Sequence, residues 1–218
     1  MRKIPPIRLA TEKAGQPWRL NPRQRRIGLT GGIATGKTTV AQWLADAQIP
    51  VLDADVYARE AVKPGTPIWA RIVDRYGPTI LQTDGHLDRQ QLGDLVFQNP
   101  GERQWLEQQI HPYVHDRFLT ALTTTHAAAP TLVLVIPLLF EAGLTHLVTE
   151  IWVVTCSPDQ QQTRLMQRNH LSAEQALARI HSQMDLATKA AQADVVLDNT
   201  TTLAALWAQV QAAIARGG

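Results

Sequence analysis

The stretch IGLTGGIATGKTT, residues 27–39, decides the fold of this 218-residue chain. Its first four residues form a short apolar run typical of a buried strand, and residues 31–38 match the pattern G-x-x-x-x-G-K-[ST] in full. Glycines let the backbone turn so that successive N–H groups point inward, and a helix over residues 37–47 would add the positive end of its dipole. A strand, a glycine-rich loop and a helix in this order form a cradle for polyphosphate.

This cradle predicts that a nucleoside triphosphate binds to the chain. Lys37 offers a mobile positive charge to the outer phosphates, which makes it a catalytic candidate, and the Thr38 hydroxyl is a candidate ligand for Mg²⁺. The loop and helix residues expected to contact the nucleotide are Gly32, Ile33, Ala34, Thr35, Gly36, Lys37, Thr38 and Thr39.

Outward from the cradle, short apolar segments alternate with helical patterns. We expect strands at residues 27–30, 50–52, 131–136, 151–155 and 194–197. We expect helices at residues 37–47, 56–62, 66–76, 88–97, 102–122, 158–168 and 201–215, and a further helix that opens at residue 172. Pro112 lies inside one of these patterns and should kink or end it. The alternation predicts an α/β fold, a P-loop NTPase-type three-layer sandwich with a five-stranded parallel sheet.

Composition excludes several classes of protein. With 44% hydrophobic and 18% charged residues the chain can bury a core, which excludes a disordered or collagen-like chain. No segment approaches the roughly 20 apolar residues of a membrane span, so we expect no membrane partner. The single cysteine, Cys156, cannot form an internal disulfide, which makes the cytoplasm the default location.

The basic charge is concentrated at the start of the chain. Residues 1–26 hold eight basic residues and one acidic residue, a net charge of +7, which leaves −5 for the rest of a chain whose total is +2. This stretch is broken by prolines and shows no periodicity, so we interpret it as a flexible basic leader. The high isoelectric point of 8.9 belongs to the leader, and we therefore expect no nucleic-acid partner.

The other motifs narrow the kind of P-loop protein. A GTPase needs the guanine-reading pattern N-K-x-D, and no Asn in this chain is followed by Lys. Mechanical ATPases usually place an Asp at the end of a strand after the loop, whereas the strongest strand signal here, residues 131–136, is followed by Pro137. These observations favour a small kinase, which needs an acceptor pocket and a lid.

Two aspartates follow the second expected strand, one strand over from the cradle. Alternation along an extended chain would send the carboxylates of Asp53 and Asp55 to the same side. A carboxylate in this place can accept a hydroxyl proton or hold a magnesium-bound water. The alternative interpretation is a pair of turn aspartates or an N-cap for the next helix.

Arginines in the second half of the chain suggest the lid. Arg164 and Arg168 lie four residues apart in an expected helix and should point the same way, and Arg179 follows on the next helix. Arginines on a mobile helical hairpin can close over a transferring phosphoryl group and exclude water. The alternative is a solvated basic face.

Two histidines share the same spacing. His111 and His115 could suggest a metal pair, but no Glu follows His111 and Pro112 distorts the spacing. We therefore interpret them as non-metal residues, and His111 as a candidate to line an acceptor pocket.

Six stretches recur in the order of one known family, from residue 27 to about residue 206. They are IGLTGGIATGKTTVA, VLDADVYAREAVKPG, DGHLDRQQLGDLVF with LEQQIHPYV, VIPLLFEAGL, QTRLMQRN and ADVVLDN. Together they resemble the dephospho-coenzyme A kinase family. The leader is not part of the family pattern, and Val135 stands where some members carry an Asp two places before the Pro of I-P-L-L-F-E.

The resemblance implies a cytoplasmic, Mg²⁺-dependent enzyme that transfers the γ-phosphoryl of ATP to the ribose 3′-hydroxyl of dephospho-CoA, the last step of coenzyme A synthesis. It implies that Asp55 faces this hydroxyl, and we expect Asp53 to lie nearer the metal. It also implies further site residues, in which Arg59, His111, Pro137 and Leu138 shape the acceptor site and Arg164 and Arg168 belong to the lid. Residues 27–218 would form the kinase domain, with an acceptor-binding insertion at about 56–125 and a lid at about 160–190.

Two other readings remain open on the residues alone. One is a kinase for another small metabolite or a nucleoside monophosphate, and the other is a regulatory protein that binds nucleoside triphosphate and turns it over poorly. The oligomeric state has no signature in the sequence.

Overall fold

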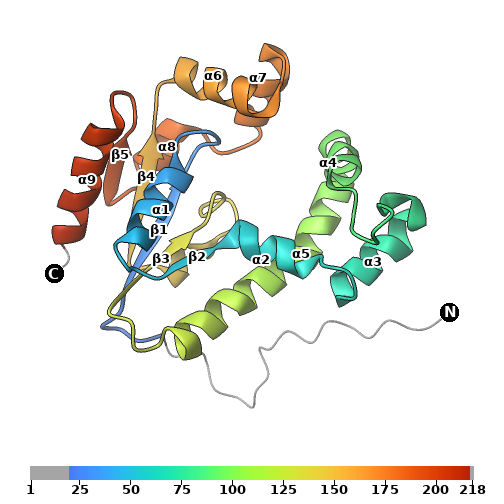
Figure 1. Ribbon diagram of the computed structural model, residues 1–218, viewed down its shortest axis with the longest axis horizontal. Coiled ribbons are helices and arrows are strands. Elements are labelled where there is room, and N and C mark those ends of the chain that lie inside the picture. Colours follow the sequence, from blue (N-terminus) through green and yellow to red (C-terminus); the bar gives the residue numbers. More distant parts are fainter. Residues whose placement is uncertain (1–19, 217–218) are drawn as a thin grey trace. The chain divides into compact units, whose positions relative to one another are not determined.

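The computed structural model describes residues 20–216 of the chain (Figure 1). These residues divide into two compact units. One unit comprises residues 54–127 and is helical, and the other comprises residues 21–53 and 128–216 and contains the sheet. We call them the helical unit and the sheet unit.

The described part of the sheet unit contains five parallel strands in the order β2-β3-β1-β4-β5 (Figure 1). Their bounds are β1 (Arg25–Gly31), β2 (Val51–Asp53), β3 (Thr131–Val135), β4 (Glu150–Thr155) and β5 (Val195–Asp198). Parallel strands need crossover connections, and helices supply them along this chain. The predicted fold class is confirmed.

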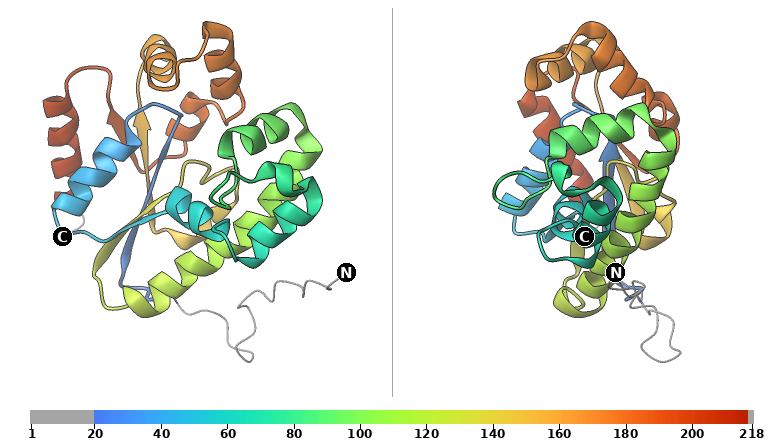
Figure 2. Two further views of the ribbon diagram at one scale, coloured as in Figure 1. Left: turned by 45° about the vertical axis from the view of Figure 1, so that its right-hand side comes forward. Right: turned by 90° about the vertical axis from the view of Figure 1, so that its right-hand side faces the viewer.

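The core of the sheet unit lies between one face of the sheet and two helices, α1 (Lys37–Asp46) and α9 (Leu203–Ala215), which lie side by side (Figure 2). Because side chains alternate along a strand, every second strand residue points to this face. The buried strand residues are Ile27, Leu29, Val133, Val135, Trp152, Val154 and Leu197, and the helical residues packed on them are Val40, Leu44, Leu206, Val210 and Ala213.

Three further helices complete the sheet unit. Capping boxes begin two of them, with Ser157 before α6 (Pro158–Asn169) and Ser172 before α7 (Ala173–His181). The short helix α8 (Leu186–Ala190) was not predicted, and it contacts β1 and β4. A single helical turn at Leu144–Leu147 precedes β4.

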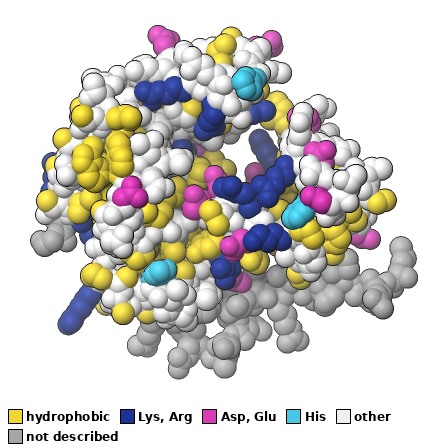
Figure 3. Space-filling view, in the orientation of Figure 1, with side chains coloured by type: hydrophobic (Ala, Val, Ile, Leu, Met, Phe, Trp, Pro, Cys, Tyr) yellow, Lys and Arg dark blue, Asp and Glu magenta, His cyan; other side chains and the backbone are white. Residues whose placement is uncertain are grey.

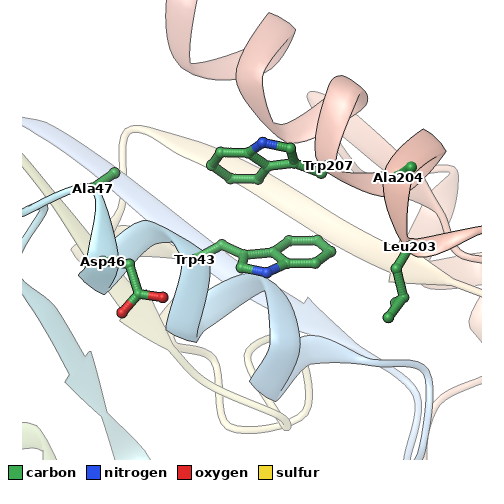
Figure 4. A pocket seen from close by; sticks show the side chains of 6 residues that line it. All are labelled: Trp43, Asp46, Ala47, Leu203, Ala204 and Trp207. Carbon is green, nitrogen blue, oxygen red and sulfur yellow. The ribbon is translucent and has the colours of Figure 1, made fainter.

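An apolar pocket of about 510 Å³ lies on the surface of α1 and α9 (Figure 4). Hydrophobic side chains gather on the surface over these two helices (Figure 3). The rings of Trp43 and Trp207 face each other there, with centroids 5.3 Å apart and planes tilted by 59°. The other lining residues are Asp46, Ala47, Leu203 and Ala204. The pocket lies at the carboxyl end of α1, whereas the predicted phosphate cradle lies at the amino end, so the two are separate features.

The helical unit is built from α2 (Ala54–Ala61), α3 (Pro67–Tyr76), α4 (Arg89–Gln98) and α5 (Pro100–Thr120). Its core consists of apolar residues from these helices and their connections, namely Ala61, Ile68, Ile72, Ile80, Leu87 and Leu92. The connections include a turn of 3₁₀ helix at Pro78–Ile80, and a π-helical turn at Ala121–Thr125 follows α5. Arg75 joins α3 to α5 through two hydrogen bonds to Glu102, of 2.7 and 2.8 Å.

Two helices of the helical unit bear on the expected bounds. The first helix begins at Ala54, two residues earlier than predicted. Pro112 lies inside α5, which runs for 21 residues from Pro100 to Thr120, so the helix does not end at this proline, and a kink there stays a prediction. Proline removes one intrahelical hydrogen bond, but packing of Val114, Phe118 and Leu119 in the buried interior supplies a larger driving force to continue the helix. Among residues 20–216, no helix is both long enough and apolar enough to cross a membrane.

The first strand also begins earlier than expected. Arg25 and Arg26 belong to β1, and the Arg25 guanidinium donates to Glu150 Oε1 at 2.6 Å and to the Ala213 and Ile214 carbonyls at 2.8 Å each. Arg26 is buried, and its Nε donates to the Leu147 carbonyl at 2.8 Å. Both arginines fall in the stretch predicted to be a flexible basic leader, and for them this prediction is wrong. Residues 1–19 of the predicted leader lie outside the described residues.

We therefore expect two truncations to differ in stability. Deletion of residues 1–26 removes Arg25 and Arg26 with their partly buried hydrogen bonds, whereas deletion of residues 1–19 leaves them in place. Leaving buried polar groups without partners costs about 1–3 kcal/mol each, so the shorter form should lose about 2–5 kcal/mol relative to the longer one. Urea unfolding of the two truncated proteins measures this, and equal midpoints would contradict it.

Candidate active site

The loop between β1 and α1 has the backbone of an anion-binding cradle. Gly31, Ala34 and Gly36 have φ values of 146°, 59° and 108°, so the chain turns repeatedly through conformations in which N–H groups converge. Gly36 is the N-cap of α1, and as a glycine it provides no side-chain cap to the first N–H groups of the helix. These N–H groups and the helix dipole suit a phosphate.

Lys37 and Thr38 lie at the start of α1, where the motif predicted them. Lys37 is half-buried, and its Nζ donates to the carbonyls of Gly31, at 3.1 Å, and Gly32. The ammonium group therefore lies at the cradle itself. Thr38 is exposed, so its hydroxyl is accessible to a ligand.

The back of the cradle is tied to the end of β5. Asn199 Nδ2 donates to the Thr35 carbonyl at 2.8 Å, and the Asn199 carbonyl accepts from Arg164 Nη2 at 3.2 Å. A Cβ on Gly36 would lie 2.4 Å from Asn199 Nδ2, which explains why glycine is required there. Arg164 is therefore linked to the loop indirectly, because Asn199 bonds to both Arg164 and Thr35.

The two predicted lid arginines have different surroundings. Arg164 Nη1 is buried and finds no hydrogen-bond acceptor among the described residues, which makes it a candidate to bind a phosphate or another acceptor on the nucleotide. Arg168 is exposed, and its Nε donates to Asn169 Oδ1 at 2.9 Å. Burial raises the pKa of the nearby Cys156 thiol against the lowering influence of Arg164 and Lys37, so this cysteine remains a neutral thiol.

We expect Arg164→Ala to lower kcat by about 10–100-fold while changing the dissociation constant of ATP less, because a guanidinium aimed at developing charge acts mainly in the transition state. Arg216→Ala, at the exposed end of α9, is the control and should stay near wild type. Steady-state kinetics and calorimetric ATP binding measure the two quantities. Equal losses in kcat and in ATP affinity would make Arg164 part of the ground-state ATP site instead.

Asp53 and Thr38 are the residues of the sheet unit that could hold Mg²⁺. Asp53 is the last residue of β2, and it pairs with Val135 of the neighbouring strand β3. The strand next to β3 therefore carries a carboxylate beside Val135. No cluster of three or more potential metal-ligating side chains occurs within residues 20–216. One carboxylate and one hydroxyl nevertheless fit Mg²⁺, which usually keeps several waters and binds substrate phosphates as well.

The predicted acceptor residues of the helical unit lie on α2 and α5. Asp55 is exposed in the first turn of α2, and its carbonyl accepts from Arg59 Nε at 3.0 Å. Because α2 begins at Ala54, Asp55 is helical, and the strand alternation that was to align it with Asp53 does not apply. His111 is exposed on α5.

The segment after β3 holds the other two predicted acceptor residues, Pro137 and Leu138, which are half-buried in the sheet unit. The Pro137 carbonyl accepts from the Thr30 hydroxyl at 3.1 Å and from Lys189 Nζ at 3.0 Å. Lys189 is fully buried and pairs with Glu141 Oε1 at 2.8 Å. Burial alone would raise the pKa of Glu141, but hydrogen bonds from Lys189 and from backbone N–H groups outweigh it and lower the pKa.

Sequence reasoning missed several residues that support the site, namely Gln161, Gln183, Lys189 and Asn199. Gln and Asn carry no charge pattern, and Lys189 lies in a short polar stretch that predicts an exposed helix. The stretch ADVVLDN around the last strand resembles the family pattern, and its final residue, Asn199, was the one available signal.

The cradle at the end of a central parallel strand, with a lysine and a half-buried arginine beside it, defines a P-loop protein of the small-kinase type. A family model described as dephospho-CoA kinase matches residues 25–205. Curated relatives with that name include one from Trichormus variabilis, 60% identical over 192 residues that cover 88% of this chain and 97% of the relative. Another, from Synechocystis sp., is 58% identical over 190 residues that cover 87% and 94%.

Solved structures agree with this assignment. The chain is similar to the crystal structure of TT1252 from Thermus thermophilus, with 35% identity and a TM-score of 0.73 over 88% of this chain and 97% of that one. It is also similar to dephospho-CoA kinase from Campylobacter jejuni, with 26% identity and a TM-score of 0.67 over 88% and 96%. The chain belongs to the dephospho-CoA kinase family.

Proposed function

We propose that this chain transfers the γ-phosphoryl group of ATP to the 3′-hydroxyl of the ribose of dephospho-CoA, with Mg²⁺, and so completes coenzyme A. One observation carries the proposal: the family match spans residues 25–205 and includes a cradle whose backbone, lysine and uncapped helix suit a polyphosphate. The identities of 58–60% to curated dephospho-CoA kinases support the choice of acceptor.

The cradle would bind and orient ATP. The N–H groups at the start of α1 would donate hydrogen bonds to the phosphates, and Lys37 would exchange its loop carbonyls for outer phosphate oxygens. Arg164 Nη1 would gain the acceptor it lacks. Bound Mg²⁺ would neutralise charge on the phosphates, with Thr38 and Asp53 as its protein ligands. These roles, with Arg168 as a second lid cation, are proposals for each residue.

The acceptor would be handled mainly by the helical unit. Asp55 would take the proton of the 3′-hydroxyl as general base, and Arg59 and His111 would bind the rest of dephospho-CoA together with Pro137 and Leu138. Arg59 is anchored on α2 by its bond to the Asp55 carbonyl, which keeps the base and a cation on the same helix turn. We further propose the cytoplasm as the location, because one buried cysteine needs no oxidising compartment.

An assay of acceptor choice tests the proposal. ADP release is followed with Mg²⁺ and ATP in the presence of dephospho-CoA, AMP or adenosine, and the product is identified by mass spectrometry. Transfer to dephospho-CoA alone supports the proposal. Preference for AMP or adenosine would indicate another small-metabolite kinase, and ATP binding without acceptor-dependent ADP release would indicate a regulatory nucleotide-binding protein.

A further inference from the structure

Two glutamine side chains hold one residue of the cradle from both sides. The Ile33 N–H donates to Gln183 Oε1 at 3.0 Å, and the Ile33 carbonyl accepts from Gln161 Nε2 at 2.9 Å. Gln161 is a buried residue of α6, and Gln183 lies in the connection between α7 and α8. Both glutamines therefore come from outside the loop, from the segment that the sequence analysis interpreted as a lid.

The neighbouring residue shows what these hydrogen bonds do. Ala34 has a φ of 59°, a left-handed conformation that is unfavourable for a residue with a Cβ and persists only where the surroundings enforce it. The Gln161 bond fixes the peptide unit between Ile33 and Ala34, and the Gln183 bond fixes the unit before it. The two consecutive peptide units that lead into the left-handed turn are thus both held by side chains.

The position of Gln161 also explains why residue 32 of the loop is a glycine. A Cβ on Gly32 would lie 2.4 Å from Gln161 Nε2, so glycine here makes room for the glutamine. A carboxamide also suits both positions chemically. It accepts from the N–H at one and donates to the carbonyl at the other, and it adds no charge next to a polyphosphate site.

Gln183 is itself held in place. The N–H of Met184 donates to Glu141 Oε1 at 3.0 Å, and Glu141 pairs with the buried Lys189. The Gln183 side chain is therefore presented to Ile33 by a segment anchored on the residues that follow β3. This anchoring reduces the freedom that the glutamine loses when it bonds to the loop.

We propose that Gln161 and Gln183 are positioning residues that hold the phosphate-binding loop in its nucleotide-binding conformation. ATP affinity would then depend on hydrogen bonds supplied from the α6–α8 segment, without direct contact between either glutamine and the phosphates. The inference rests on the proposed function only in naming ATP as the nucleotide.

Methionine substitutions test this role because methionine keeps the length of glutamine and removes its amide. We expect Gln183→Met and Gln161→Met each to raise the KM and the dissociation constant for ATP about 5–30-fold, while the KM for dephospho-CoA changes less than about two-fold. Gln167 is an exposed residue of α6, the helix that contains Gln161. Gln167→Met is therefore the matched control, and its ATP affinity should equal that of the wild type. ATP affinity that is unchanged, or tighter because the Gln183 bond competes with nucleotide, would overturn the proposal.

The double variant separates a shared role from two independent ones. Since both glutamines act through Ile33, the double substitution should weaken ATP binding by less than the product of the two single effects. If the double variant weakened ATP binding by the full product of the two single effects, the two glutamines would act independently, and the claim that they act together on Ile33 would be overturned. Direct ATP binding also keeps the two proposals distinct, because a wild-type protein that binds ATP but does not phosphorylate dephospho-CoA would refute the proposed function and still report on the glutamines.

Discussion

Lys37→Ala should lower the rate of phosphoryl transfer by about 10²–10³-fold, the typical effect of removing one preorganised group that stabilises transition-state charge. The Lys37 ammonium lies on the carbonyls of Gly31 and Gly32, at the mouth of the cradle, where the outer phosphates would lie. The Lys37 side chain is half-buried and is not part of the hydrophobic core, so the variant should fold. Single-turnover transfer from labelled ATP measures the rate, and circular dichroism checks the fold.

Two further variants sharpen this result. Lys37→Met keeps most of the side-chain length without the charge, so it should resemble Lys37→Ala if charge is what matters. Lys63→Ala removes an exposed lysine of the helical unit and should retain wild-type transfer. A folded Lys37→Ala protein with wild-type turnover would contradict the role of Lys37 in the cradle.

The sheet and the cradle could be predicted because their signals are local. The run of apolar residues before Gly31 and the motif through Thr38 each depend on neighbours within a few positions. The parallel sheet then follows from the alternation of elements. Its strand bounds were predicted to within about two residues, the usual uncertainty at element ends.

The parts that could not be predicted depend on contacts between distant residues. Arg25 is held by Glu150 and by the end of α9, more than 100 positions away, so its basic character alone indicated solvent. Lys189 is buried only because Glu141 and the Pro137 carbonyl meet it. A glutamine such as Gln183 carries no local pattern that reveals its partner.

For Asp53 and Asp55 the sequence motif was recognised correctly, but the local backbone conformation predicted for it was wrong. The resemblance to the family named Asp53 and Asp55, but strand alternation was the wrong reason to align them, because the chain becomes helical at Ala54. Asp53 ends a strand of the sheet unit, and Asp55 opens a helix of the helical unit. This division favours different roles for the two carboxylates, one toward the metal and one toward the acceptor.

That difference leads to the second large effect. Asp55→Asn should bind ATP normally but transfer phosphoryl to dephospho-CoA about 10²–10³-fold more slowly, in the lower half of the usual range for general-base catalysis. Asn keeps the size and can still hydrogen-bond the acceptor hydroxyl, but it cannot take the proton. Because the transition state of phosphoryl transfer is loose, proton removal is late, and the base supplies only part of the rate.

The position of Asp55 also determines how much Asp55→Asn lowers the stability of the protein. A carboxylate in the first turn of a helix is favourable by about 0.3–1 kcal/mol, so Asp55→Asn should lower the stability of the helical unit only slightly. A rate loss of two orders of magnitude in a protein with nearly unchanged thermal unfolding would therefore report chemistry. The Arg59 contact should survive, since Nε bonds to the Asp55 backbone carbonyl, which the substitution does not alter.

Asp53→Asn is the matched control for Asp55→Asn, because it removes the same charge from a residue only two positions away. If Asp53 holds the metal, its loss should raise the Mg²⁺ concentration needed for half-maximal transfer, whereas the loss of Asp55 should leave that concentration near its wild-type value. Single-turnover transfer from labelled ATP, titrated with Mg²⁺ and accompanied by separate ATP-binding measurements, distinguishes the two. Wild-type transfer by Asp55→Asn would show that Asp55 is not the base. A Mg²⁺ requirement raised by Asp55→Asn rather than by Asp53→Asn would reverse the two roles, with Asp55 as the carboxylate nearer the metal.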